Sequence, residues 1–153
     1  MSAIDTSAMT VNKRPRAPGF TLLELMVVVI IVGVIAAFAI PNYNKSMQKA
    51  HERDMLAQLT AVHAANLLFR SYDGNYWDTG GTDKNMAQIN SALSINIISD
   101  SSTTYNYNSA NGSSYTATAD WDAYTLQVTE AAIDTANNPC CSTDNCLSVP
   151  DCP

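Results

Sequence analysis

Gly19-Phe20-Thr21-Leu22-Leu23-Glu24-Leu25, which continues through an apolar run to Ile40-Pro41, is the stretch that decides the fold. Only Glu24 is charged between Phe20 and Ile40. At about 1.5 Å per residue, a helix over this run is roughly 31 Å long and can cross the hydrocarbon core of a bilayer. The sequence therefore predicts a membrane-spanning helix over residues 20–41.

The segment before this run, residues 1–19, is polar and reads as a leader peptide. Its basic residues Lys13, Arg14 and Arg16 stand just before the apolar run. Because basic residues flanking a span remain in the cytoplasm, the N-terminus is expected inside and everything after Pro41 across the membrane.

Glu24 and the pair Gly19-Phe20 distinguish this segment from an ordinary anchor. A carboxylate in hydrocarbon costs about 2.5–3.5 kcal/mol, and no Lys, Arg or His between Phe20 and Asn44 can offset it. A secretory signal peptide would carry its cleavage site after the apolar run, whereas Gly19-Phe20 precedes it. Cleavage there would leave an α-amine four residues from Glu24. Two staggered copies could then pair amine with carboxylate.

Residues Gly19 to Pro41 resemble the N-terminal segment of type IV pilins, specifically the type IVa class. The resemblance implies cleavage after Gly19, N-methylation of Phe20, and a pilus core in which Glu24 faces a neighbour's Phe20 amine. It also implies that the helix loosens in the fibre between Gly33 and Pro41, which agrees with the helix-weakening effect of Gly and Pro. Close packing between membrane helices is the alternative role of Gly33.

The same resemblance implies a function, partners and a location. The chain would be a structural subunit of a type IV pilus, a helical homopolymer that supports adhesion or twitching motility. Its partners would be copies of itself, a prepilin peptidase and the pilus assembly machinery. It would reside in the inner membrane with a periplasmic head before assembly, and in the extracellular pilus afterwards. The alternative is a pseudopilin of a type II secretion system, which shares the N-terminal motif.

Composition narrows the function classes further. The chain has 153 residues and a net charge of −6, and an acidic head argues against bulk nucleic-acid binding. No Gly-x-Ser-x-Gly, P-loop or His-Glu-x-x-His motif is present, so neither an enzyme nor a cofactor is expected. His51 and His63 are too far apart on one helix to share a metal.

Residues 42–73 are expected to continue the helix as an amphipathic half. Its apolar stripe has helical spacing and is interrupted by Asn66. The stripe consists of Met55, Leu59, Val62 and Phe69. A mixed-charge stretch just outside the membrane is expected to lie on the helix surface, where it is either solvated or faces neighbouring copies in a fibre. That stretch contains Lys45, Lys49, Glu52, Arg53 and Asp54.

Residues 74–103 are expected to form a connector. Gly74 suits the left-handed cap that ends a helix, and Tyr72, Tyr76 and Trp77 are expected to wedge the connector against the helix. Apolar spacing predicts one short helix from about Asp83 to Leu93. The isoleucines of 95–98 then suit an extended segment at the sheet edge.

Residues 104–130 predict an antiparallel meander with three strands, Thr104–Asn108, Tyr115–Ala119 and Tyr124–Thr129. Turns are expected at Asn111-Gly112 and at Asp120-Trp121-Asp122. The fold class is therefore α+β, a long N-terminal helix packed on a small antiparallel sheet, as in pilins.

The carboxylates near the second turn raise a possible calcium site. They are Asp120, Asp122, Asp134 and Asp144. Because no Gly-spaced twelve-residue loop accompanies them, a solvated turn is favoured and no metal is expected.

Residues 131–153 form a cysteine-rich loop with Cys140, Cys141, Cys146 and Cys152. Four cysteines allow three pairings, and a bond between the adjacent pair is strained. One of the adjacent cysteines is therefore expected to join Cys146 and the other Cys152. A zinc site is the alternative, but the paired C-x2-C spacing of zinc sites is absent.

Overall fold

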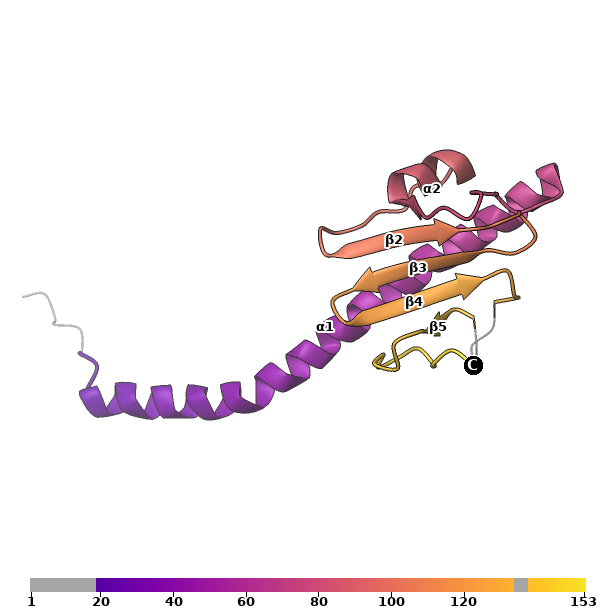
Figure 1. The fold of residues 1–153 in the computed structure, drawn as a ribbon. Helices are drawn as coiled ribbons and strands as arrows, with labels where there is room; N and C mark the ends of the chain where they lie inside the picture. The colour runs from indigo at the N-terminus through magenta and orange to yellow at the C-terminus, as the bar shows by residue number, and fades with distance from the viewer. Residues whose placement is uncertain (1–18, 134–137) are drawn as a thin grey trace, which may run out of the picture. The chain divides into compact units, whose positions relative to one another are not determined.

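The computed structural model describes residues 19–133 and 138–153, and its chain divides into two compact units. The first unit ends at Ile40, and the second, Pro41–Pro153, is called the head below. Helix α1, Leu22–Asp73, contributes to both units (Figure 1). Its helical assignment is continuous through Gly33 and Pro41, so the expected loosening between them stays a prediction about the fibre.

Helix α1 ends where the chain can adopt a left-handed conformation. Gly74 has φ +85°, and its N–H donates to the carbonyl of Arg70 at 2.9 Å. This bond satisfies one of the carbonyls that a helix end leaves without a partner, which is the reason glycine suits this position.

The head contains a five-stranded antiparallel sheet with strand order β1-β2-β3-β4-β5 (Figure 1). Its strands are β1 Lys84–Asn85, β2 Thr103–Asn108, β3 Thr116–Trp121, β4 Tyr124–Thr129 and β5 Cys140–Cys141. The predicted fold class, a long N-terminal helix with a small antiparallel sheet, is confirmed. The two-residue strands β1 and β5 were not predicted.

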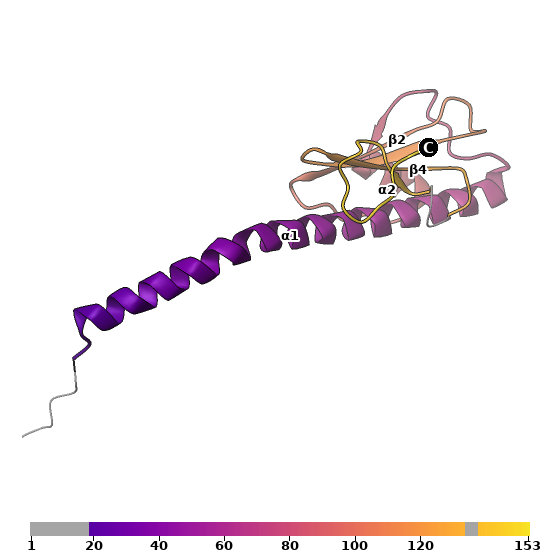
Figure 2. The same cartoon turned by 90° about the horizontal axis from the view of Figure 1, so that it is seen from below.

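One face of this sheet packs on the head's part of α1, as Figure 2 shows. The buried strand positions alternate along each strand, as expected for a sheet with one solvated face. They are Tyr105, Tyr107, Ala117, Ala119, Leu126 and Val128. The register sets Tyr105 opposite Ala119 and Tyr107 opposite Ala117, so that small side chains leave room for the rings.

Helix α2, Met86–Leu93, begins at a complete capping box. The Asn85 side chain accepts from the Gln88 N–H at 3.1 Å, and the Gln88 side chain accepts from the Asn85 N–H at 3.1 Å. Ile89 and Leu93 are buried, so the helix adds its apolar face to the core beside β1 and β2.

The first hairpin turn contains Asn111-Gly112 as expected, and the second differs from the expected turn. The connection between β2 and β3 spans residues 109–115, and the N–H of Tyr76 donates to the carbonyl of Gly112 at 2.8 Å, which docks this loop on the connector. The next connection is shorter than expected. Trp121 pairs with Tyr124 inside the ladder, and Asp122 takes φ +54° in the turn.

The expected aromatic wedge is only partly correct. Tyr76 is 3% exposed and packs edge-on against Tyr115, and Trp77 stacks on Tyr107. Tyr72 is 91% exposed, so its assignment to the wedge was wrong. Its place in the last turn of α1 puts it on the solvent side, which periodicity near a helix end does not reveal.

Candidate functional site

The N-terminal segment begins α1 with a reciprocal cap. The N–H of Glu24 donates to the hydroxyl of Thr21 at 3.2 Å, and the N–H of Thr21 donates to the Glu24 carboxylate at 3.5 Å. Thr-x-x-Glu is the sequence signature of a capping box, and an acid in the first turn also favours the helix dipole. Glu24 thus has polar neighbours but gains no compensating positive charge from them.

The rest of this segment is apolar and unburied. An 18-residue window of α1 has mean hydropathy 2.9 with none of it buried, so the helix is long and apolar enough to cross a membrane. Phe20, at the predicted processing position, is 79% exposed. Leader residues 1–18, including the basic cluster, lie outside the described residues, and Gly19 is exposed at their boundary.

Glu52 corrects the expectation of a uniformly wet mixed-charge stretch. Its side chain is fully buried, and both carboxylate oxygens accept hydrogen bonds from the C-terminal loop. The N–H groups of Leu147 and Ser148 donate at 2.7 and 2.8 Å, and the Ser148 hydroxyl donates as well. Lys45, Lys49, Arg53 and Asp54 are exposed as expected.

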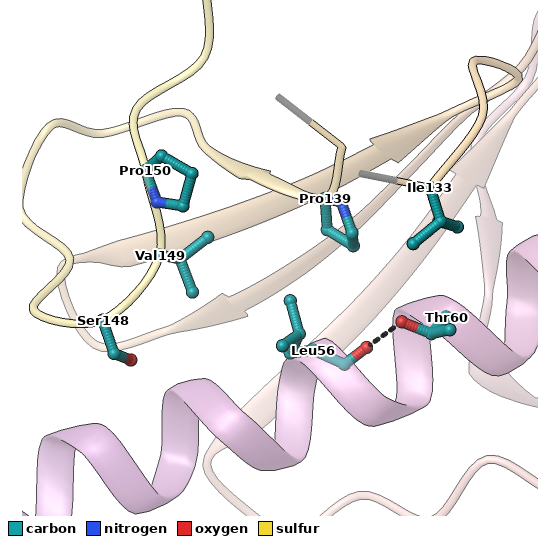
Figure 3. Close-up of a pocket in the computed structure, with 7 residues that line it drawn as sticks. All are labelled: Leu56, Thr60, Ile133, Pro139, Ser148, Val149 and Pro150. Atoms are coloured by element: carbon teal, nitrogen blue, oxygen red, sulfur yellow. Dashed lines mark hydrogen bonds between the residues drawn. The ribbon is translucent and has the colours of Figure 1, made fainter. Parts of the chain in front are cut away.

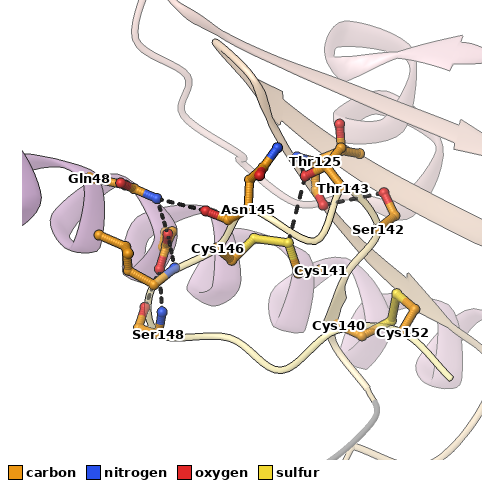
Figure 4. Close-up of a disulfide and its surroundings, with 12 residues drawn as sticks. Gln48, Thr125, Cys140, Cys141, Ser142, Thr143, Asn145, Cys146, Ser148 and Cys152 are labelled. Atoms are coloured by element: carbon orange, nitrogen blue, oxygen red, sulfur yellow. Dashed lines mark hydrogen bonds between the residues drawn. A yellow bond between two sulfur atoms is a disulfide. The ribbon is translucent and has the colours of Figure 1, made fainter.

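A second helix residue extends this contact. The Gln48 amide donates to Glu52 at 2.9 Å and to the carbonyl of Asn145 at 3.1 Å (Figure 4). The contact of Gln48 and Glu52 with residues 145–148 is called the loop latch below. The latch fixes the C-terminal loop on α1, although the loop has few apolar residues of its own.

Two disulfides close the same loop (Figure 4). Cys140 is bonded to Cys152, and Cys141 to Cys146. Cys140 and Cys141 form β5, which pairs with Leu126 and Gln127 of β4. The loop is therefore held to the sheet by the cysteines and to α1 by the latch.

A hollow lies between α1 and the C-terminal loop. It has a volume of about 330 Å³ and is largely apolar (Figure 3). The residues that line it are Leu56, Thr60, Ile133, Pro139, Ser148, Val149 and Pro150. Two of its lining residues, Ile133 and Pro139, lie next to the segment 134–137, which is outside the described residues. We therefore assign the hollow no ligand.

Polar groups in the core are used structurally. The Tyr115 hydroxyl lies 2.6 Å from Nδ1 of His63, and Tyr107 donates to Asn66 at 3.1 Å. Burial raises the pKa of Tyr115 and Tyr107 well above the usual tyrosine range. Asn66, which interrupts the apolar stripe in the sequence, is thus the helix partner of a buried strand tyrosine.

Of the carboxylates weighed as calcium ligands, Asp120 has other hydrogen-bond partners. Asp120 accepts from the Thr125 hydroxyl at 2.7 Å and from Asn106 at 3.3 Å on the open face of the sheet. Asp134 lies outside the described residues. Within 19–133 and 138–153, no group of three His, Cys, Asp or Glu side chains is arranged to hold a metal ion.

Sequence comparison points to the N-terminal segment. The prokaryotic N-terminal methylation motif matches residues 14–40. The type IV major pilin protein PilA of Myxococcus xanthus is 42% identical over 64 residues, which cover 42% of this chain and 29% of that protein. No solved structure shows a significant match.

Type II secretion proteins match as well. Core protein G of Klebsiella pneumoniae is 36% identical over 61 residues, covering 40% of this chain and 44% of that protein. The Vibrio cholerae core protein G is 39% identical over 54 residues, covering 35% and 37%. The matches thus span less than half the length of each of these relatives.

The motif match overlaps the capped apolar helix described above, and the head supplies the helix-on-sheet architecture. The chain therefore carries the prokaryotic N-terminal methylation motif, a 64-residue part of it is similar to a type IV major pilin, and its α+β architecture is pilin-like.

Proposed function

We propose that this chain is a structural subunit of a type IV pilus that polymerises through residues 20–41. The observation that carries the proposal is Glu24, the one charged residue in an unburied apolar helix that matches the methylation motif. Its polar contacts in the isolated chain come from Thr21 and bring no positive charge. A Phe20 amine from a neighbouring copy would supply that charge inside an apolar bundle.

Processing precedes assembly in this proposal. A prepilin peptidase cuts between Gly19 and Phe20, and Phe20 becomes N-methylated. The chain waits in the inner membrane with its head in the periplasm until the assembly machinery extracts it. The basic residues of the leader favour this orientation, and the two disulfides fit an oxidising compartment. The assembled fibre would serve adhesion or twitching motility.

The second candidate is a pseudopilin of a type II secretion system. Several similar proteins are type II secretion core proteins G, and their matches cover about as much of the chain as the match to the pilin does. The C-terminal loop with its two disulfides favours the pilin, because closing that loop by a disulfide is common among the pilins that this chain resembles.

An intact mass of fibres sheared from the cell surface tests the proposal. The expected chain begins at methylated Phe20 and is lighter by four hydrogens than the reduced form, one pair for each disulfide. Processed chain confined to the membrane fraction would favour the pseudopilin instead. A chain that keeps residues 1–19 would contradict assembly through a processed N-terminus.

A further inference from the structure

Helix α1 carries a basic stripe at the start of the head. Lys45, Lys49 and Arg53 follow one another at intervals of four residues, so they line one side of the helix. All three side chains are exposed. Within the described part of the chain, none of them has a carboxylate at ion-pair distance.

The other side of the same helix carries an acidic pocket. Its volume is about 290 Å³, and it is lined by Met47, Ala50, His51, Asp54 and Asp100. Nδ1 of His51 lies 3.6 Å from Oδ2 of Asp100, and the His51 ring stacks on Trp121 at 4.1 Å. The pocket therefore joins an apolar wall to two carboxylates, which is the complement of a lysine stem and its ammonium.

A buried hydroxyl within electrostatic range of these carboxylates has no hydrogen-bond partner among the described residues. Tyr105 is 2% exposed, and its hydroxyl makes no hydrogen bond within the described part of the chain. Burial raises the pKa of Tyr105, and the charges of Asp54 and Asp100 raise it further, so both carboxylates act on this hydroxyl. An unpaired buried hydroxyl is costly, and the isolated chain leaves this one unsatisfied.

Lys49, the middle residue of the stripe, does not face the pocket of its own chain. Lys49 and Asp54 are five residues apart, and at 3.6 residues per turn they point roughly 140° away from each other. A contact between different patches on two copies is heterologous, and repeating it builds an open helical filament rather than a closed ring.

We propose that the acidic pocket of one copy receives a basic side chain from the Lys45–Arg53 stripe of the next copy in the filament. The inference rests on the proposed polymer and names a second contact within it, separate from the apolar helix core. This contact fixes the rotation between neighbouring heads. Opposite charges meet at one relative rotation of the two heads, and at other rotations like charges repel each other.

Charge reversal in the full chain tests this contact. We expect Asp54→Lys and Lys49→Asp each to lower the yield of sheared fibres by about tenfold, because like charges would then face each other between copies. Asp73→Lys is the matched control, an exposed aspartate on the same helix away from the pocket, and should leave the yield unchanged. Normal chain level and disulfide formation on a non-reducing gel show that each variant folds.

Co-expression of the two failing variants separates contact between copies from contact within one. In a mixed fibre, Lys49 of the Asp54→Lys chain meets Asp54 of the Lys49→Asp chain, and the introduced Asp meets the introduced Lys at the next joint. We expect mixed fibres, and fibres of the double variant, to return to within about twofold of wild type.

The outcomes keep this inference distinct from the proposed function. Wild-type fibres with neutral single reversals, or with no rescue by mixing, overturn the pocket contact and leave the pilus subunit intact. Absence of processed fibres from the wild-type chain overturns the proposed function and this inference with it.

Discussion

Glu52 on α1 accepts a 2.7 Å hydrogen bond from the N–H of Leu147, a residue 95 positions further along the chain. The carboxylate is fully buried, yet no cation accompanies it among the residues that the structure describes. Two backbone N–H groups, the Ser148 hydroxyl and the Gln48 side-chain amide take the place of a salt bridge, an arrangement that stabilises a buried carboxylate without a second buried charge.

Removal of the Glu52 carboxylate should destabilise the head. Glu52→Ala leaves the N–H groups of Leu147 and Ser148 without their acceptor, at a cost of about 3 kcal/mol. Thermal unfolding of the full chain in detergent measures the change. Glu130→Ala is the matched control, because Glu130 is exposed and accepts one long hydrogen bond, 3.4 Å from Tyr115. Equal effects of the two variants would contradict a structural role of the latch.

The latch and the Cys141–Cys146 disulfide should be energetically coupled. Both hold residues 145–148, so losing one leaves the other to keep the loop in place. We expect Glu52→Ala combined with Cys141→Ser and Cys146→Ser to cost more than the sum of the separate changes, by about 1 kcal/mol. A thermal-unfolding double-mutant cycle measures this coupling, and strict additivity would show that the two restraints act on independent parts of the loop.

Alkaline pH should unfold the head. The folded-state pKa values of Tyr105, Tyr107 and Tyr115 lie above the usual value of about 10, chiefly because the rings are buried. Stability from these rings is complete below pH of about 10 and is lost as the pH rises above it, because the unfolded chain then loses protons that the folded chain retains. Circular dichroism and tyrosinate absorbance should change together. Ionisation of all three rings near the usual tyrosine pKa of about 10, without unfolding, would contradict their burial.

Two conservative changes should separate a satisfied hydroxyl from an unsatisfied one. Tyr115→Phe removes a hydroxyl 2.6 Å from His63 and should cost about 1–2 kcal/mol in the free energy of unfolding. Tyr105→Phe removes a hydroxyl without a partner among the described residues and should be neutral or stabilising. Comparison of the two unfolding midpoints measures the difference. A larger loss in Tyr105→Phe would show that its hydroxyl has a bonding partner.

Glu24 should matter for assembly and not for insertion. Glu24→Ala removes the carboxylate that we propose pairs with a neighbour's Phe20 amine, so fibre yield should fall while the membrane-inserted amount stays unchanged. Thr21→Ala is the control for the helix cap, because it removes the Thr21 hydroxyl from the capping box and leaves the charge. If Thr21→Ala impairs assembly as strongly as Glu24→Ala, the cap rather than the intermolecular pair explains the effect.

Local signals in the sequence were sufficient for much of this fold. The alternation of Tyr124–Thr129 predicted β4, because the period of two reports one buried face directly. The glycine after Asp73 likewise predicted the end of α1, since φ +85° needs no long-range partner. The turn at Asn111-Gly112 was predicted in the right place, but its docking bond from Tyr76 to Gly112 joins distant residues and left no local signal.

The loop latch could not be predicted for a related reason. Glu52 lies among exposed charged residues in the sequence. Helical periodicity places it near the apolar stripe but does not identify its hydrogen-bond partner. Its donors are backbone N–H groups, which every residue except proline carries, so no residue type in the C-terminal loop identifies them. Asn66 did leave a signal, since a polar residue that interrupts an apolar stripe requires a buried partner.

The separation of Glu52 from Leu147 also sets an order of events during biosynthesis. The ribosome synthesises the apolar helix well before residues 145–152, so the helix can enter a bilayer before the latch exists. Contacts between such distant parts of a chain form late, because their loop-closure entropy must be overcome. Both disulfides can therefore form only after the helix, the strands and the C-terminal loop have all been synthesised.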